Sequence, residues 1–230
     1  MALNISLDDV QSRVAAVADQ DENTSNITSA DYSLRRSYIN MAQREWSETY
    51  DWKALYKENN SVVSTSTGNT SVVLPEDFRK LAAQPLITHD GTNTDFFQEI
   101  RPQEIGQFDL QTARFVYILG NQADNYTMVV NAAGTLSSGA SIKLPYYASP
   151  ASLVSPADVA MCPNPEYLVQ RTLAYIWEGQ SDPRFQQAKG EADKILQKML
   201  DFEVTYGESY YDRVNTTERT QFKNFRWGKN

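Results

Sequence analysis

One polar run of the sequence has residue types that could bind a metal or act in catalysis. His89 is the only histidine, and it lies in ITHDGTNTD together with Asp90, Asn93 and Asp95. Oxygen ligands at alternating positions are typical of calcium loops, but this run lacks the remaining ligands and the closing glutamate of an EF-hand. Asp-Gly between two β-type segments instead indicates a hairpin turn. We therefore predict a turn here rather than a metal site or a catalytic histidine.

Cysteine chemistry has equally little support. Cys162 is the only cysteine, so no disulfide forms within the chain. Its neighbours Met161 and Pro163 supply neither a base nor a cation that would activate the thiol. We predict that Cys162 is a small buried apolar residue.

Carboxylate pairs are the remaining candidates for catalysis. Glu76 with Asp77, or Glu99 with Glu104, have the chemistry of a glycosidase acid and base, but sequence spacing does not establish that two carboxylates converge. No glycine-rich phosphate loop is present, because the glycines are scattered among turn signals. We predict that the protein is not an enzyme and has no catalytic residue, cofactor or metal.

Composition and charge favour a globular protein with an acidic body. The 230 residues are 41% hydrophobic, which is enough for a sizeable core, and neither a signal peptide nor a membrane-length apolar run is present. We expect a soluble chain that is not exported. The net charge is -8, with +4 on residues 213–230 and therefore -12 on residues 1–212. An acidic surface repels phosphates, which suits a protein that DNA passes without binding, although such surfaces also simply maintain solubility.

The N-terminal segment, residues 1–52, is predicted to be helical. Ser6 and Asp9 form a capping-box pattern ahead of a helix that ends near Ala18. A loop of about ten residues follows, because the run has no apolar periodicity. A second helix begins near Ser29, and Arg35 is expected to lie off its apolar stripe. That stripe comprises Leu34, Tyr38, Met41, Ala42 and Trp46.

Residues 53–148 are predicted to be a β-rich insertion. Short runs rich in valine, isoleucine and aromatic residues alternate with turn signals, and their spacing leaves no room for crossover helices. This pattern favours an antiparallel sandwich or a small barrel, with LPEDFRKL and RPQEIGQF as single helical turns. The aromatic residues of the insertion are expected in its core, although exposed rings on strands would suit sugar binding. They include Phe96, Phe97, Phe115 and Tyr117.

Residues 149–212 are predicted to return the chain to the helices. A surface connection rich in proline leads to a helix capped by Asn164, with Pro165 at its first position and its end at Gly179. Asp182 and Pro183 repeat the same signal, so two antiparallel helices should complete the bundle. The predicted buried stripe of the last helix comprises Phe185, Ala188, Ala192, Ile195, Met199 and Phe202. The predicted fold class is α+β: a helical bundle with an inserted β sandwich or barrel and an extended C-terminal arm.

The arm, residues 213–230, has no second apolar face with which to bury itself. It mixes aromatic and basic side chains, which are typical anchors of protein interfaces. A frayed terminus without a partner is the alternative. The candidate anchors are Arg213, Arg219, Phe222, Lys223, Phe225, Arg226 and Trp227.

Four stretches carry a resemblance to a known family. LPYYASPASL, NPEYLVQRTLAYIW and DPRFQQAKGEADKILQKML, together with LPEDFRKL, are similar to the head-to-tail adaptors of tailed bacteriophages, especially short-tailed ones. The order of helices, β insertion, proline-rich return, paired helices and loose arm also resembles that family over most of the chain.

The resemblance implies a structural protein of the virion neck, assembled in the bacterial cytoplasm. Such adaptors form a ring, usually of twelve copies, that joins the portal to the tail nozzle and sometimes contacts fibres. It also implies that the arm binds the portal and that the acidic body lines the channel for DNA. A carbohydrate- or receptor-binding β module of a phage tail is the alternative function.

Overall fold

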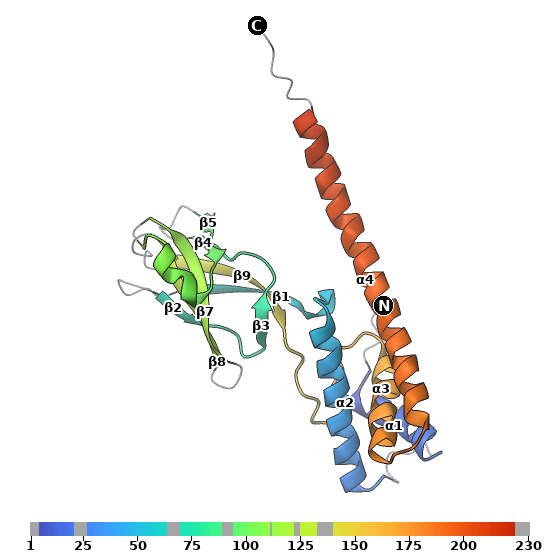
Figure 1. Cartoon of the computed structure of the whole chain (residues 1–230). Coiled ribbons are helices and arrows are strands. Elements are labelled where there is room, and N and C mark those ends of the chain that lie inside the picture. Colours follow the sequence, from blue (N-terminus) through green and yellow to red (C-terminus); the bar gives the residue numbers. More distant parts are fainter. Residues whose placement is uncertain are drawn as a thin grey trace. The chain divides into compact units, whose positions relative to one another are not determined.

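The computed structural model describes residues 5–20, 27–63, 70–88, 94–110, 112–121, 125–132 and 140–223. The chain divides into two compact units. Met1–Lys53 and Ser152–Asn230 form a helical unit, and Ala54–Ala151 form a β unit (Figure 1). Helices and two sheets in one chain confirm the predicted α+β class.

The first two helices begin where the sequence predicts. In α1 (Leu7–Ala18), the Ser6 side chain accepts from the Asp9 amide at 3.1 Å, and the Asp9 carboxylate accepts from the Ser6 amide at 3.1 Å. This exchange is the predicted capping box. In α2 (Ser29–Thr49), the Thr28 hydroxyl accepts from the Asp31 amide at 3.1 Å. Both caps satisfy amides that have no partner within the helix.

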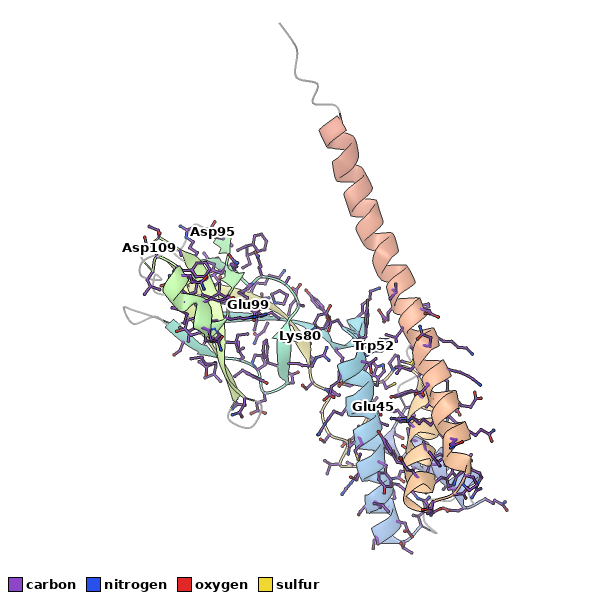
Figure 2. All side chains as sticks on the ribbon, in the orientation of Figure 1. Glu45, Trp52, Lys80, Asp95, Glu99 and Asp109 are labelled. Atoms are coloured by element: carbon purple, nitrogen blue, oxygen red, sulfur yellow. The ribbon has the colours of Figure 1, made fainter. Side chains whose placement is uncertain are left out.

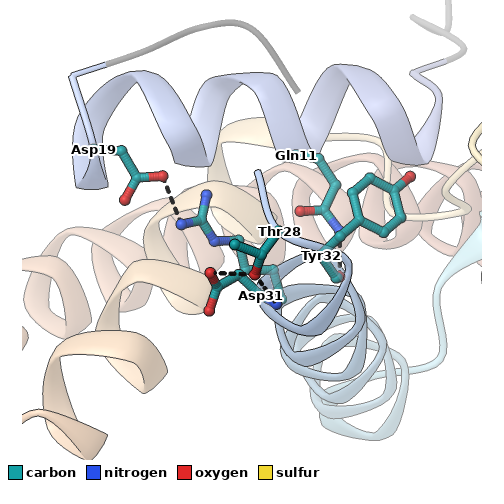
Figure 3. A network of polar contacts seen from close by, with 6 residues as sticks. Gln11, Asp19, Thr28, Asp31 and Tyr32 are labelled. Atoms are coloured by element: carbon teal, nitrogen blue, oxygen red, sulfur yellow. Dashed lines mark hydrogen bonds and ion pairs between the residues drawn. The ribbon is translucent and has the colours of Figure 1, made fainter. Parts of the chain in front are cut away.

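The contact between α1 and α2 is partly polar and corrects the predicted phase of α2 (Figure 3). Arg35 is buried and donates to Asp19 at 2.6 Å, and the Gln11 amide donates to the Tyr32 carbonyl at 3.0 Å. Leu34 and Met41, predicted to be buried, are instead 51% and 46% exposed. The physical reason is that Arg35 buries its aliphatic stem while its guanidinium has an acceptor on Asp19.

The β unit contains two sheets. The first has the order β1, β9, β4, β5, with β3 also pairing β9; the second has the order β2, β8, β7, β6. All pairs are antiparallel except the short β6–β7 pair, which is parallel. The strands are β1 (Tyr56–Val63), β2 (Thr70–Val73), β3 (Phe78–Leu81), β4 (Leu86–Thr88), β5 (Thr94–Phe96), β6 (Gln98–Glu99), β7 (Arg114–Asn121), β8 (Asn125–Ala132) and β9 (Ala140–Ala148).

Both sheets contribute to one apolar core, as the predicted sandwich requires. Phe78, Ile87 and Ile142 from the first sheet share it with Val116 and Met128 from the second. Burial of these side chains away from water stabilises the pairing of the sheets. Along β9, buried and exposed positions alternate from Ala140 to Leu144, which is the pattern of a strand with one face on a core.

Two local predictions in the β unit differ from the structure. In LPEDFRKL, only the first half turns, and Phe78–Leu81 forms strand β3 because Phe78 enters the core while the backbone pairs with β9. The other predicted turn, RPQEIGQF, is confirmed as the 3-10 helix η3 (Pro102–Gln107). Phe97 and Phe115 are buried, but Phe96 is 67% exposed, because adjacent residues of an extended chain point to opposite sides.

Hydrogen bonds hold the proline-rich connection between β9 and α3 against helix α2. Leu153 and Asn40 exchange two hydrogen bonds, of 2.8 and 3.0 Å, and the Met161 amide donates to buried Gln43 at 2.8 Å. Leu153 and Cys162 are buried, so the connection does not lie wholly on the surface as predicted. Polar side chains of α2 thereby replace the hydrogen bonds that a regular element would make.

The last two helices follow the predicted caps. In α3 (Pro165–Gly179), the Asn164 side chain accepts from the Glu166 amide at 3.0 Å. The 40-residue helix α4 (Arg184–Lys223) packs on α3. Residues 213–223 continue α4, which differs from the extended arm expected from the sequence. No proline interrupts the chain after Pro183, and lengthening an existing helix adds a backbone hydrogen bond for each residue.

Candidate interaction site on helix α4

Helix α4 is fixed at its start by a local polar contact. The Arg184 amide donates to Asp182 Oδ1 at 2.9 Å, and the Arg184 guanidinium donates to Oδ2 at 2.7 and 3.0 Å. These hydrogen bonds lower the pKa of Asp182. The guanidinium also lies over the Trp177 ring, with 4.6 Å between Cζ and the ring centroid. The helix starts at Arg184, one residue after the predicted first position.

Small side chains bring the first turns of α4 close to the bundle. Ala188 and Ala192 are buried, whereas Ile195 and Met199 are only half-buried. Alanine at four-residue spacing lets two helix backbones approach closely. Burial along α4 therefore decreases toward its middle.

An ion pair links α3 to α2. The Arg171 guanidinium donates to both oxygens of Glu45 at 2.7 and 2.5 Å, and the Tyr175 hydroxyl donates to the same carboxylate at 2.7 Å. Tyr175 also stacks on Tyr38, with 5.7 Å between ring centroids. Figure 2 labels Glu45 and Trp52, both on the helical unit. These contacts fix α3, and α3 in turn supports α4.

A cleft of about 370 Å³ opens beside the middle of α4. Phe202 is 61% exposed at this cleft, although its place in the apolar stripe predicted a buried ring. Trp52 is buried beneath, stacked on Trp46 with 5.3 Å between centroids, and Lys53 pairs with Glu203 at 3.7 Å. The lining residues are Trp52, Pro163, Asn164, Lys198, Met199, Phe202 and Glu203. The combination of apolar walls and charged rims suits a protein partner.

The predicted arm begins in the last part of α4. Arg213, Arg219, Phe222 and Lys223 belong to the helix, at 213–223. The other three predicted anchors, Phe225, Arg226 and Trp227, lie outside the described residues. Their role in binding stays a prediction.

Two of the four carboxylate candidates, Asp77 and Glu104, make structural contacts, and Glu99 is exposed on β6. Asp77 accepts from Lys57 at 2.5 Å and from the Tyr146 hydroxyl at 3.0 Å, whereas the neighbouring Glu76 is exposed. Burial and the hydrogen bond to Asp77 raise the pKa of Tyr146 to about 12. The Glu104 carboxylate accepts from the Arg101 amide at 3.2 Å and caps η3.

The histidine and cysteine candidates give no reactive site among the described residues. His89, Asp90 and Asn93 lie outside those residues, and Asp95 pairs with Arg114. Cys162 is buried, as predicted, and burial raises the pKa of its thiol to about 12. Within the described ranges, no three histidine, cysteine or carboxylate side chains are grouped to hold a metal ion.

The comparison with protein families identifies the chain. The family model described as SU10 adaptor protein matches residues 5–217. The chain belongs to this adaptor family. The resemblance to phage head-to-tail adaptors is thereby confirmed over the helical unit, the β unit and most of α4. A search of curated proteins finds no match. None of the helices in the described parts of the chain is long and apolar enough to cross a membrane.

Sequence reasoning missed the cleft. Its walls come from three separate segments, and only the folded helical unit brings Trp52, Pro163 and Phe202 together. No local signal distinguished Phe202 from a buried member of the stripe, because charged neighbours such as Asp201 and Glu203 also flank the core residues of ordinary amphipathic helices.

Proposed function

We propose that this SU10-family adaptor is a structural virion protein whose copies form a ring between the portal and the tail nozzle. The proposal is supported by the family match over residues 5–217 and by the length of helix α4. At 1.5 Å per residue, the 40 residues of α4 span about 60 Å, against about 22 Å for the 15 residues of α3. A helix that outreaches its supporting helix suits a protein that connects two other components.

The portal is the proposed partner of the arm, residues 213–230. Its charge of +4 contrasts with -12 on the rest of the chain, so an acidic groove on a partner would attract the arm and repel the body. Aromatic and arginine side chains in the arm provide the anchors. These anchors are Arg213, Arg219, Phe222, Lys223, Phe225, Arg226 and Trp227.

The acidic body is proposed to line the channel through which DNA passes. Negative charge repels phosphates and leaves no counterion release to drive DNA binding. The ring, which the resemblance suggests has twelve copies, would contact the nozzle and a fibre by surfaces other than the arm. Such a component belongs in the virion neck and is assembled in the host cytoplasm.

Truncation tests the role of the arm. A chain ending at Asp212 should keep the fold of both units and lose binding to the portal in a pull-down. A matched full-length variant with Arg213, Arg219, Lys223 and Arg226 changed to glutamine separates charge from chain length. Unchanged portal binding by the truncated chain would refute the assignment of the arm. Negative-stain images with and without the portal test the ring itself.

One observation favours the alternative function. Phe96 on β5 is 67% exposed, and an exposed aromatic ring on a strand is a typical platform for a sugar. Under this alternative, the β unit binds a glycan and Phe96→Ala abolishes that binding. Glycan-array binding by a monomeric chain, lost in Phe96→Ala, would support a tail receptor-binding module instead of a ring.

A further inference from the structure

Helix α2 has an exposed face that carries two large apolar side chains. Leu34 is 51% exposed and Met41 is 46% exposed. Together with exposed Glu48, they lie at positions i, i+7 and i+14, which share one face of a helix. Ile39 and Trp46, by contrast, are fully buried on the inner face. The outer face thus offers an apolar ridge with an acidic residue at its C-terminal end.

The cleft beside α4 offers the complementary chemistry. Phe202 and Met199 provide an apolar wall, and Lys198 provides a positive charge at the rim, where the charge of Glu203 is paired with Lys53. A volume of about 370 Å³ is near the lower end for ligand pockets, so it accommodates a few side chains rather than a folded domain. Side chains projecting from a neighbouring helix are occupants of suitable size.

The two surfaces belong to different helices of the same unit. Helix α3 packs against both α2 and α4, and Figure 1 shows it between them. A ridge on one helix and a cleft at another can pair twice across a two-fold axis or once head to tail. Only the head-to-tail contact leaves a free ridge and a free cleft at the two ends, and it generates a ring when its rotation closes.

We propose that the Leu34–Met41 face of α2 in one copy docks into the α4 cleft of the next copy. The inference rests on the proposed ring, and it names the two surfaces that form it. Met41 would pack beside Phe202, and Glu48 would pair with Lys198. Neither Glu48 nor Lys198 has an ion-pair partner among the described residues. Opposite charges at the rim fix the register of such a contact.

A second copy is the occupant that the charges and stoichiometry favour. Each copy carries both the Leu34–Met41 ridge and the α4 cleft, so both of these surfaces are covered on every copy when the ring closes. A different protein bound at the cleft would leave Leu34 and Met41 exposed to water on every copy, at a cost in unburied apolar area.

Paired cysteines test the contact directly. The full-length variant Met41→Cys with Phe202→Cys, treated with a short bis-maleimide, should give a ladder of covalent multimers on a reducing gel. Each single variant should stay monomeric, because a head-to-tail contact never brings two identical positions together. Cys162 is buried and therefore gives little background. Dimers from a single variant, or no ladder from the double variant, would overturn the inference.

A charge exchange provides the second test. Glu48→Lys and Lys198→Glu should each reduce the assembled fraction in size-exclusion chromatography, and the double variant should restore it. Both side chains are exposed, so the fold tolerates the changes. Rings in negative stain without a ladder and without rescue overturn the contact but leave the proposed function standing. A chain that forms no ring, alone or with the portal, overturns both.

Discussion

The ion pair between α2 and α3 gives the sharpest test of how the helical unit is held together. The change Glu45→Gln keeps the size of the side chain and removes its charge. Three donated hydrogen bonds of 2.5–2.7 Å, two from Arg171 and one from Tyr175, lose their charged acceptor. The guanidinium of Arg171 then stays in place without a counter-charge.

The expected loss in the free energy of unfolding depends on how exposed the side chains of Arg171 and Glu45 are. A hydrogen bond to a charged group contributes about 1.5–3 kcal/mol, and breaking a buried ion pair costs about 3–5 kcal/mol. The side chain of Arg171 is 13% exposed but that of Glu45 is 40% exposed, so water compensates part of the loss. We therefore expect Glu45→Gln to lower the free energy of unfolding by about 1.5–3 kcal/mol.

Tryptophan fluorescence isolates the helical unit in this measurement. Trp46, Trp52 and Trp177 belong to that unit, and residues 54–151 contain no tryptophan. The fourth tryptophan, Trp227, lies in the arm. Urea unfolding of the full chain followed by tryptophan fluorescence therefore reports on the helical unit and the arm and not on the β unit. A double-mutant cycle with Arg171→Met should give a coupling energy of about 1–2 kcal/mol.

Glu178→Gln is the matched control for this change. Glu178 lies on α3, the helix of Arg171, is exposed and has no ion-pair partner among the described residues, so its change should stay within about 0.5 kcal/mol. If Glu45→Gln costs no more than the control, or if the coupling energy is zero, the pair does not hold α3 to α2.

Three further predictions follow from burial. The Cys162 thiol, with its pKa raised to about 12, should resist a thiol reagent at pH 8 and react fully in urea; rapid labelling of the folded chain would contradict its burial. Because the pKa of Tyr146 is raised from 10.0 to about 12, its contribution is complete below pH 10 and is lost as the pH rises through 12. Tyr146→Phe should therefore cost about 1 kcal/mol at neutral pH by circular dichroism, and its stability should change less between pH 10 and 12 than that of the parent. Ala192→Leu should cost about 1–3 kcal/mol by overpacking, and half-buried Ile195→Ala less than the 2–5 kcal/mol typical of a fully buried residue. A larger cost at Ile195 than at Ala192 would mean that α4 packs by a different face.

Local signals in the sequence predicted the ends of the helices well. Ser6, Asn164 and Asp182 each make their capping contact with an amide two or three residues ahead. Such contacts depend on near neighbours in the chain, so the sequence alone contains both partners. The order of strands along the chain was predictable for the same reason, because turn residues lie next to the strands that they connect.

Which face of each helix is buried was less predictable. Arg35 is buried because Asp19, from another element, accepts its hydrogen bond, and no local pattern reveals that partner. Leu34 and Phe202 fit apolar stripes, yet both are largely exposed. A hydrophobic pattern predicts that a face will be covered, but it does not distinguish cover within the chain from cover by another copy.

The question of whether an apolar face is covered within the chain or by another copy arises most clearly for α4, because this helix is much longer than α3. A partner helix of 15 residues, α3, can support about 22 Å of a helix that spans about 60 Å. Isolated helices gain little stability in water, because most of it comes from packing an apolar face. Under the proposed function, a ring of copies and a bound portal would supply a surface that stabilises the remainder of α4. The exposed ridge on α2 and the cleft at Phe202 indicate where that support begins. If assembly supplies it, hydrogen exchange of the α4 amides after Phe202 should slow by more on ring formation than exchange within α3.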